Sequence, residues 1–178
     1  FEKHNIDAVP FKHPDIDEWR NNFKGIRYIS EEHQYNFGGA IDDVWEKPNG
    51  QLIISDVKTT AKNEFDWEDT YNKYDYAKGY QRQLEMYQWL FKMNGNDVAP
   101  EAYIIYYNGK KNEPFFDKKL KFDEYVIKLD CSTDWVEEKV IATANLIRSD
   151  EFPKPSSTCE NCNYLKKRWE LSQKINNV

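Results

Sequence analysis

The spacing of apolar side chains predicts three helices. Within residues 77–93, the apolar and aromatic positions recur at three- and four-residue steps, as one face of an amphipathic helix requires, at Tyr80, Leu84, Tyr87 and Phe91. The pair Asn94-Gly95 ends this segment. Residues 133–148 form a second candidate, with Ser132 or Thr133 as the N-cap and Glu137 downstream. A terminal basic helix is expected over residues 164–173.

Runs of β-branched and aromatic residues predict five strands, at 25–37, 39–46, 51–58, 101–108 and 121–129. Pro48-Asn49-Gly50 separates the second and third strands, and Asn-Gly readily takes positive φ, so these two strands should form a β-hairpin. The order is strand, strand, strand, helix, strand, strand, helix. It predicts a mixed α/β fold in which helices flank one sheet.

Three segments show neither the helical period nor the two-residue alternation of a strand. Residues 1–22 are polar and are expected to form an irregular lead-in, with a short helix over 15–23. Residues 61–76 mix acidic and aromatic side chains, and we expect a long loop with one helical turn, a candidate flap over a site. Two prolines, Pro153 and Pro155, precede a cysteine-bearing end. We expect one domain over residues 1–178, with 150–178 as its tail.

Composition narrows the possible partners. The 178 residues carry a formal charge of −6, which argues against a protein that binds nucleic acid by electrostatic attraction alone. No apolar run is long enough to cross a bilayer and no secretory leader pattern is visible, so no membrane partner is expected. Three cysteines are too few and odd in number for a disulfide scaffold, which fits a reducing, cytoplasmic location.

The predicted hairpin brings two carboxylates and a lysine together. Side chains alternate between the faces of a strand, so Asp56 and Lys58 share one face, and Val57 points into apolar packing on the other. Asp42 and Asp56 are about equally far from the turn at Asn49, so strand pairing brings them to similar heights. We therefore expect Asp42, Asp56 and Lys58 at one end of a sheet face.

Such a cluster has a chemical use. Two close carboxylates repel each other, and a divalent cation with a preference for oxygen, Mg²⁺ or Mn²⁺, relieves that repulsion. We expect Asp42, Asp56 and the backbone carbonyl of Val57 to bind this metal, which can activate water and neutralise charge on a phosphoryl oxygen. Lys58 can orient or deprotonate the water, or stabilise the pentacovalent phosphorane. Phosphodiester hydrolysis requires an activated water, neutralised charge on the phosphoryl oxygen and stabilisation of the phosphorane.

Two flanking features support this interpretation. Gly39, three residues before Asp42, allows a backbone or a substrate to approach closely. Gln83 and Tyr87 are four residues apart on the predicted helix, hence on one face, from which they can reach over a strand end. The alternative is that these residues form no active site. Asp-x-Lys is common at strand ends and alone indicates almost nothing. Tyr87 would then be an ordinary core aromatic residue and Gln83 a partly exposed polar one.

The ordered motifs GAID (39–42), DVKTT (56–60) and QRQLEMYQWL (81–90) resemble those of the PD-(D/E)XK nuclease superfamily. The resemblance is greatest to the RecB-type branch, which includes phage exonucleases and CRISPR-associated nucleases. That branch has a Gly-x-x-Asp strand, an Asp/Glu-x-Lys strand often followed by Thr, and a Gln-x-x-x-Tyr helix. The resemblance covers roughly residues 25–108.

The resemblance implies a restriction-endonuclease-like core with the order αβββαβ. It also implies Asp42 and Asp56 as metal ligands, Lys58 as the catalytic lysine, and Gln83 and Tyr87 as the pair that supports the site and contacts DNA. The expected activity is that of an Mg²⁺- or Mn²⁺-dependent deoxyribonuclease, an exonuclease of phage or DNA repair and recombination type. The expected partners are single- or double-stranded DNA ends, and a homo-oligomer or a larger recombination complex.

Two departures from the family pattern concern metals. Many relatives carry a metal-binding histidine on a helix before the first strand, but His4, His13 and His33 lack that context. Glu31 or Glu32 could supply a carboxylate ligand instead.

Some relatives hold an iron–sulfur cluster with four cysteines. Here Cys159 and Cys162 resemble the start of the closing motif, the next cysteine is missing, and Cys131 comes too early. We therefore expect a CxxC remnant and no cluster.

The sequence leaves two alternatives open. The chain could be a catalytically inactive nucleic-acid-binding or structural module of the same fold, a hypothesis that the acidic charge and the missing histidine favour. It could also be an unrelated α/β domain that matches by chance. Retention of Asp42, Asp56 and Lys58 argues against an inactive module, because that module has no use for all three.

Overall fold

The computed structural model describes residues 1–115 and 118–176, so the last two residues of the expected tail lie outside the description. A short 3₁₀ helix occupies Glu2–His4. The other elements in chain order are β1 (Val9–Pro10), α1 (Ile16–Trp19), β2 (Ile26–Ser30), β3 (Tyr35–Gly39), β4 (Asp43–Glu46), β5 (Leu52–Thr60), α2 (Trp67–Lys73), α3 (Asp75–Met93), β6 (Glu101–Gly109), β7 (Phe122–Asp130), α4 (Val136–Arg148) and α5 (Glu160–Asn176).

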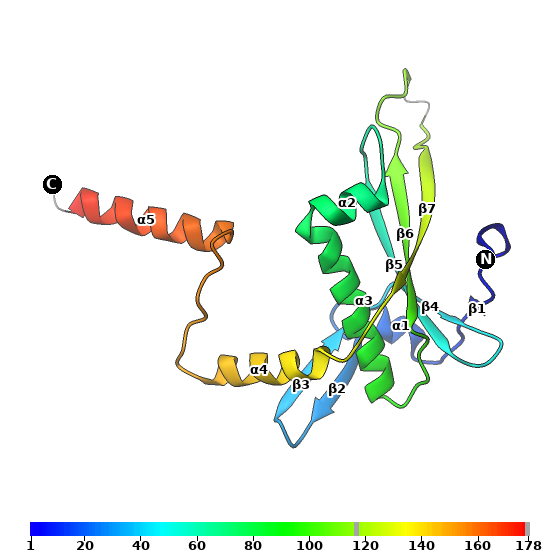
Figure 1. Ribbon diagram of the computed structural model, residues 1–178, viewed down its shortest axis with the longest axis horizontal. Helices are drawn as coiled ribbons and strands as arrows, with labels where there is room; N and C mark the ends of the chain where they lie inside the picture. The colour runs from blue at the N-terminus through cyan, green and yellow to red at the C-terminus, as the bar shows by residue number, and fades with distance from the viewer. Residues whose placement is uncertain (116–117, 177–178) are drawn as a thin grey trace. The chain divides into compact units, whose positions relative to one another are not determined.

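A five-stranded mixed sheet forms the centre of the fold, in the order β1-β4-β5-β6-β7 (Figure 1). Strands β4 and β5 are the predicted antiparallel hairpin, with Asp43 opposite Ser55. The turn between them closes with a 2.9 Å hydrogen bond from the Gly50 N–H to the Lys47 carbonyl, and Gly50 has φ +84°, as the Asn-Gly signal predicted. Strand β6 runs parallel to β5 and antiparallel to β7. The predicted mixed α/β fold is confirmed.

The predicted first strand, residues 25–37, is wrong in detail. It contains β2, a turn and most of β3, and β2 and β3 pair with each other in a separate two-stranded sheet. The turn takes a left-handed conformation at Gln34, with φ 53°, and contains no glycine that would have indicated it in the sequence. The predicted second strand also shortens, because β3 ends at Gly39 and β4 begins only at Asp43. Asp42 therefore precedes its strand.

The expected loop at 61–76 contains a helix of seven residues, α2. Its N-cap is Asp66, whose side chain accepts a 2.7 Å hydrogen bond from the Asp69 N–H. Helix α3 begins directly afterwards at Asp75, two residues earlier than the predicted start. Trp67 and Tyr71 are four residues apart on one face of α2, with their ring centroids 5.7 Å apart. The acidic and polar residues around them obscured this helical spacing in the sequence.

Helix α3 covers one face of the sheet, and its buried side chains form the main core. Leu84 and Phe91 of α3 pack in one cluster with Ile54 of β5 and Ile104 of β6, all four fully buried. The first two turns of α4 add Val136 and Val140 to the same cluster. Burial of large apolar side chains is worth roughly 1.5–3 kcal/mol each, so this layer holds α3 firmly against β5.

The opposite face has a smaller core. Ala8 from the N-terminal segment packs there with Trp45 and Ile53, and Ile105 lies beside them. This layer does not extend to Val57, a residue that is 42% exposed. The expectation that Val57 points into apolar packing was wrong: strand alternation places it on this face, but no segment among the described residues buries it.

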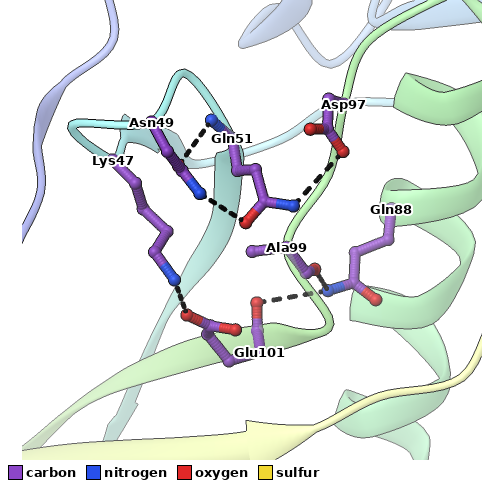
Figure 2. A network of polar contacts seen from close by, with 7 residues as sticks. All are labelled: Lys47, Asn49, Gln51, Gln88, Asp97, Ala99 and Glu101. Atoms are coloured by element: carbon purple, nitrogen blue, oxygen red, sulfur yellow. Dashed lines mark hydrogen bonds and ion pairs between the residues drawn. The ribbon is translucent and has the colours of Figure 1, made fainter.

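A polar network joins α3 to the start of β6 (Figure 2). The Gln88 side chain is 1% exposed, and its Nε2 donates to the carbonyls of Ala99 and Glu101 at 3.0 and 3.3 Å. The Lys47 ammonium donates to the Glu101 carboxylate at 2.6 Å. A buried amide without partners would cost several kcal/mol, so these bonds specify how α3 lies along β6. They also fix the residues earlier on the same helix.

The chain divides into two compact units, Phe1–Ile141 and Ala142–Val178. The first unit contains both sheets and the helices up to the first turns of α4. The second contains α5, which is longer than the predicted 164–173 and begins between Cys159 and Cys162. The prediction of one domain with a tail from residue 150 stays a prediction. In the described ranges, no helix combines the length and the apolar character needed to span a membrane.

Candidate functional site

Asp56 and Lys58 lie two positions apart on β5, on the face that α3 covers. The Lys58 ammonium forms an ion pair with Asp56 Oδ2. Asp42 approaches from the start of β4, and its Oδ2 accepts a 2.7 Å hydrogen bond from the backbone N–H of Val57. The pairing of Asp43 with Ser55 places Asp42 beside Asp56. The structure therefore brings Asp42, Asp56 and Lys58 to one end of the sheet face.

The Asp56 carboxyl group is held in an unfavourable environment for a charge. It is 3% exposed, and this burial is the largest of the effects that raise its pKa above the ordinary value. The Lys58 ammonium opposes the shift, and the negative charge of Asp42 adds to it. The buried Oδ2 makes no aligned hydrogen bond with any described residue, although the Lys58 ammonium lies against it. An additional cation would offset the cost of burying the negative charge of Asp56 beside that of Asp42.

The donor set fits a divalent cation that prefers oxygen. Asp42 and Asp56 supply carboxylate oxygens. Val57 stands between Asp56 and Lys58 in the chain, and its backbone carbonyl is the third candidate ligand. Such hard ligands suit Mg²⁺ or Mn²⁺. Over residues 1–115 and 118–176, no group of three or more His, Cys, Asp and Glu side chains is arranged to hold a metal. The two aspartates therefore form a short ligand set, of the kind that Mg²⁺ completes with water and substrate oxygens.

The histidines and the proposed extra carboxylates have other surroundings. His4 hydrogen-bonds Glu124 at 2.8 Å, on β7. His13 stacks on Trp19 of α1, with the ring centroids 4.4 Å apart. His33 lies in the turn between β2 and β3, as do Glu31 and Glu32. This turn is at the end of the hairpin opposite Gly39, so these three side chains do not join Asp42 and Asp56.

Gln83 and Tyr87 reach the site from α3, as the sequence predicted. The Lys58 ammonium donates to Gln83 Oε1 at 3.1 Å, and Gln83 Nε2 donates to the Tyr87 hydroxyl at 2.9 Å. Burial raises the pKa of Tyr87, the Gln83 bond opposes this, and the charges of Asp56 and Asp42 raise it further. Tyr87 therefore keeps its proton at neutral pH, and this O–H can donate to a substrate oxygen.

Gly39 is the point where β3 and α3 touch. A Cβ atom at Gly39 would lie 2.5 Å from Cε1 of the Tyr87 ring, closer than any real contact. The sequence indicated a close approach of a backbone or a substrate at Gly39, and in the structure the Tyr87 ring makes it. A cavity of about 320 Å³ adjoins this contact and is lined by Phe37, Arg82 and Met86 among others. It leaves room for a substrate beside the Gln83–Tyr87 pair.

Alanine at Gly39 is expected to lower the free energy of unfolding by about 1–3 kcal/mol, because the new methyl group overpacks the Tyr87 contact. Gly79 is the matched control. It lies inside α3, and a Cβ there would meet only Arg82 Nη2 at 3.8 Å. Gly79→Ala should therefore raise the free energy of unfolding by about 0.5–1 kcal/mol. Urea denaturation measures both, and a stability loss for Gly79→Ala would contradict this account.

Sequence reasoning missed two residues of this site. Arg20, just after α1, donates from Nε to the Asp42 carbonyl at 3.0 Å and pairs with the Asp43 carboxylate. The Asp43 carboxylate contacts Arg20 and accepts a 3.0 Å hydrogen bond from the Trp45 indole N–H. Asp42 is the member of the adjacent pair that acts on Asp56. No local signal could have found Arg20, 22 residues upstream. The ring centroid of Tyr80, the second missed residue, is 4.8 Å from Lys58 Nζ. Its spacing could have revealed it, because a residue three positions before Gln83 lies on the same helix face.

Comparison with known proteins identifies the family. The family model described as the PD-(D/E)XK nuclease superfamily matches residues 9–166. No curated protein matches the chain. A solved structure titled "Crystal structure of SSO0001" is similar, with 16% identity and a TM-score of 0.39 over 70% of this chain. The match covers 48% of the other chain, so this chain spans about half of its length. A likeness this remote does not indicate a function.

Proposed function

Because the chain belongs to the PD-(D/E)XK nuclease superfamily, we propose that it is a metal-dependent nuclease that hydrolyses DNA phosphodiester bonds. One observation carries the proposal. The Lys58 ammonium lies against a buried carboxylate, Asp56, whose pKa is raised by burial and by the neighbouring Asp42. A pair of aspartates crowded in this way is costly to keep unless it binds a cation, which supports a site used for catalysis.

Asp42 and Asp56, with the carbonyl of Val57, are the groups that would hold Mg²⁺ or Mn²⁺. A bound divalent metal supplies Lewis-acid stabilisation of a phosphoryl oxygen and lowers the pKa of water. Lys58 projects from the same face and can stabilise negative charge on the phosphate as the water oxygen bonds to phosphorus and the bond from phosphorus to the leaving oxygen of the strand breaks. Gln83 holds the Lys58 ammonium in place by its 3.1 Å bond. The Tyr87 O–H can donate to a non-bridging oxygen.

We further propose an exonuclease of the RecB-like branch, of phage or DNA repair and recombination type. Support comes from the order of the Gly39–Asp42, Asp56–Lys58 and Gln83–Tyr87 motifs and from the contacts that join all three at one place. DNA ends would be its substrates, and a homo-oligomer or a larger recombination complex its setting. Cytoplasmic localisation stays a prediction.

A cleavage assay tests the function. Linear and circular DNA, each single- and double-stranded, is incubated with the protein and Mg²⁺, Mn²⁺ or EDTA. We expect cleavage with either metal and none with EDTA, and an exonuclease should degrade linear DNA and spare covalently closed circles. Cleavage in EDTA would contradict the metal-dependent mechanism. No cleavage of any substrate with either metal would favour the inactive nucleic-acid-binding module.

Replacing Gln83 with alanine is expected to lower kcat about tenfold and leave KM nearly unchanged. The side chain holds the Lys58 ammonium and donates to Tyr87, and one hydrogen bond is worth about 1 kcal/mol net. Gln81→Ala is the control, because Gln81 lies on the same helix but bonds Tyr71 and Glu85 instead. Steady-state kinetics measure both variants. An equal loss of kcat in both would show that Gln83 acts only through helix stability.

A further inference from the structure

Three tyrosines form a series that leads to Lys58. Tyr74 precedes α3, and Tyr76 and Tyr80 lie in its first two turns. The rings of Tyr74 and Tyr76 are stacked, with centroids 5.4 Å apart and an interplanar angle of 24°. Tyr76 contacts Tyr80 at 5.6 Å, and the Tyr80 ring is 4.8 Å from Lys58 Nζ. The outermost ring is therefore within three such steps of the candidate catalytic group.

The outer two rings face solvent. Tyr74 is 38% exposed and Tyr76 is 42% exposed, whereas Tyr80 is half-buried beside the fully buried Tyr106. The two rings cover each other in part and the ammoniums of Lys62 and Lys73 lie over Tyr74, but the exposed parts of the rings still leave flat apolar surface in water. Such surface is suited to bind another flat ring, since stacking removes it from water without a demand for specific hydrogen bonds.

Lys62 holds the exposed rings in position. Its ammonium lies 5.0 Å from the Tyr74 centroid and donates to the Tyr76 hydroxyl and to Thr70 Oγ1, both at 3.2 Å. Its backbone is clamped by the buried Asn108 side chain, which accepts from the Lys62 N–H at 2.8 Å and donates to its carbonyl at 3.0 Å. The stacked pair is thus fixed before any ligand arrives, which lowers the entropic cost of binding.

Two lysines bring positive charge to the rings of Tyr74 and Tyr76, although the chain as a whole is acidic. The ammonium of Lys73, the last residue of α2, lies over the Tyr74 ring, 5.4 Å from its centroid. The exposed carboxylate of Asp75 is nearby, and Lys78 lies 4.0 Å from it. Lys62 and Lys73 therefore place positive charge beside the rings. Aromatic rings with lysines beside them match a ligand that carries both flat bases and phosphates.

We propose that Tyr74 and Tyr76 stack the unpaired bases of single-stranded DNA and lead the strand to Lys58. This inference rests on the proposed nuclease function, whose substrate class it narrows. Phosphates of a stacked strand are spaced about 3.4 Å along the axis, so the bases at these rings lie within roughly five nucleotides of the phosphate at Lys58. Duplex DNA fits the cluster less well, because each base face inside a duplex is already covered by its neighbours.

The test measures binding in EDTA, where the proposed cleavage does not occur. Fluorescence anisotropy compares three labelled probes: a twelve-nucleotide oligothymidylate, an abasic strand of the same length and charge, and a duplex of twelve base pairs. We expect tight binding only to the oligothymidylate. Removing both rings, in Tyr74→Ala/Tyr76→Ala, should weaken that binding by about tenfold per ring and leave abasic and duplex binding unchanged.

Two further variants make the outcome specific. Tyr74→Phe/Tyr76→Phe keeps both rings and should keep most of the affinity, even though the bond from Lys62 to Tyr76 is lost. Phe1→Ala removes a ring of similar exposure, 40%, which packs on Trp45 at the opposite sheet face, and should change nothing. Equal binding of the oligothymidylate and the abasic strand by the unaltered protein would overturn the proposal. So would unchanged affinity in the double alanine variant.

The two proposals fail separately. If the protein binds unpaired bases through the tyrosines but cleaves nothing with Mg²⁺ or Mn²⁺, the stacking site stands and the nuclease function falls. If it cleaves DNA with metal but shows no preference for bases over an abasic strand, the nuclease function stands and the stacking site falls.

Discussion

Replacing Lys58 with alanine is expected to lower kcat for DNA cleavage by about 10²–10³-fold. The ammonium is the only side-chain cation described within contact of Asp56, and Gln83 and the Tyr80 ring restrict its position. A fixed donor aimed at developing charge contributes about 2.7–4 kcal/mol to catalysis in a site that excludes water. Cleavage of a labelled strand under single-turnover conditions with Mg²⁺ measures the loss.

Loss of Lys58 also removes the partner of a buried carboxylate, so stability must be separated from catalysis. Lys47→Ala is a matched control: Lys47 is likewise a half-buried lysine paired with a carboxylate, Glu101, but at the far end of the hairpin (Figure 2). Both variants should lose some stability. At a temperature where both are folded, as circular dichroism verifies, only Lys58→Ala should lose activity. Equal activity loss in both would contradict the catalytic assignment of Lys58.

The sequence was sufficient to predict the position of Asp42 relative to Asp56. The Asn-Gly turn fixes the centre of the hairpin, and equal counting outward predicts which residues face each other. The observed pairing of Asp43 with Ser55 agrees with that count. Helix α3 was equally clear, because its apolar spacing and its end at Asn94 are both local signals. Both features depend on residues close together in the chain.

The features that the sequence did not reveal depend on distant contacts or on unusual turns. The β2–β3 hairpin turns at Gln34, where nothing in the residue type demands a left-handed backbone. Arg20 holds the backbone of Asp42 across 22 residues of sequence. Val57 alternates away from the site as expected, but burial there depends on how far the N-terminal segment extends over the opposite face. None of these can be inferred from a local pattern.

Replacing Asp56 with asparagine is expected to abolish both cleavage and stabilisation by metal. A ligand that binds only the folded protein stabilises it by about 2.7 kcal/mol at a concentration of 100 Kd, which is several degrees in Tm for a chain of this size. Asparagine keeps the shape of Asp56 but removes the charge that would bind Mg²⁺ or Mn²⁺. Thermal unfolding with and without Mn²⁺ should therefore show a shift in the unaltered protein only.

The choice of asparagine also keeps the metal-free fold intact. Lys58 loses its ion pair but retains Gln83 Oε1 as an acceptor at 3.1 Å, so it is not left without a partner. Asp123→Asn is the control, since Asp123 of β7 pairs with Lys110 and lies outside the proposed ligand set. It should keep the full metal-dependent shift in Tm. An equal shift in Asp56→Asn would exclude Asp56 as a metal ligand.

The pH dependence of stability without metal gives an independent check. The pKa of Asp56 is raised in the folded state, mainly by burial, so the folded protein binds this proton more tightly than the unfolded chain does. Stability must then fall as pH rises from the ordinary pKa of an aspartate through the raised one, and the cost is complete above it. In EDTA at pH 7, Asp56→Asn should therefore be at least as stable as the unaltered protein. Its advantage should shrink as the pH is lowered towards 4, because protonation removes the same charge that the substitution removes.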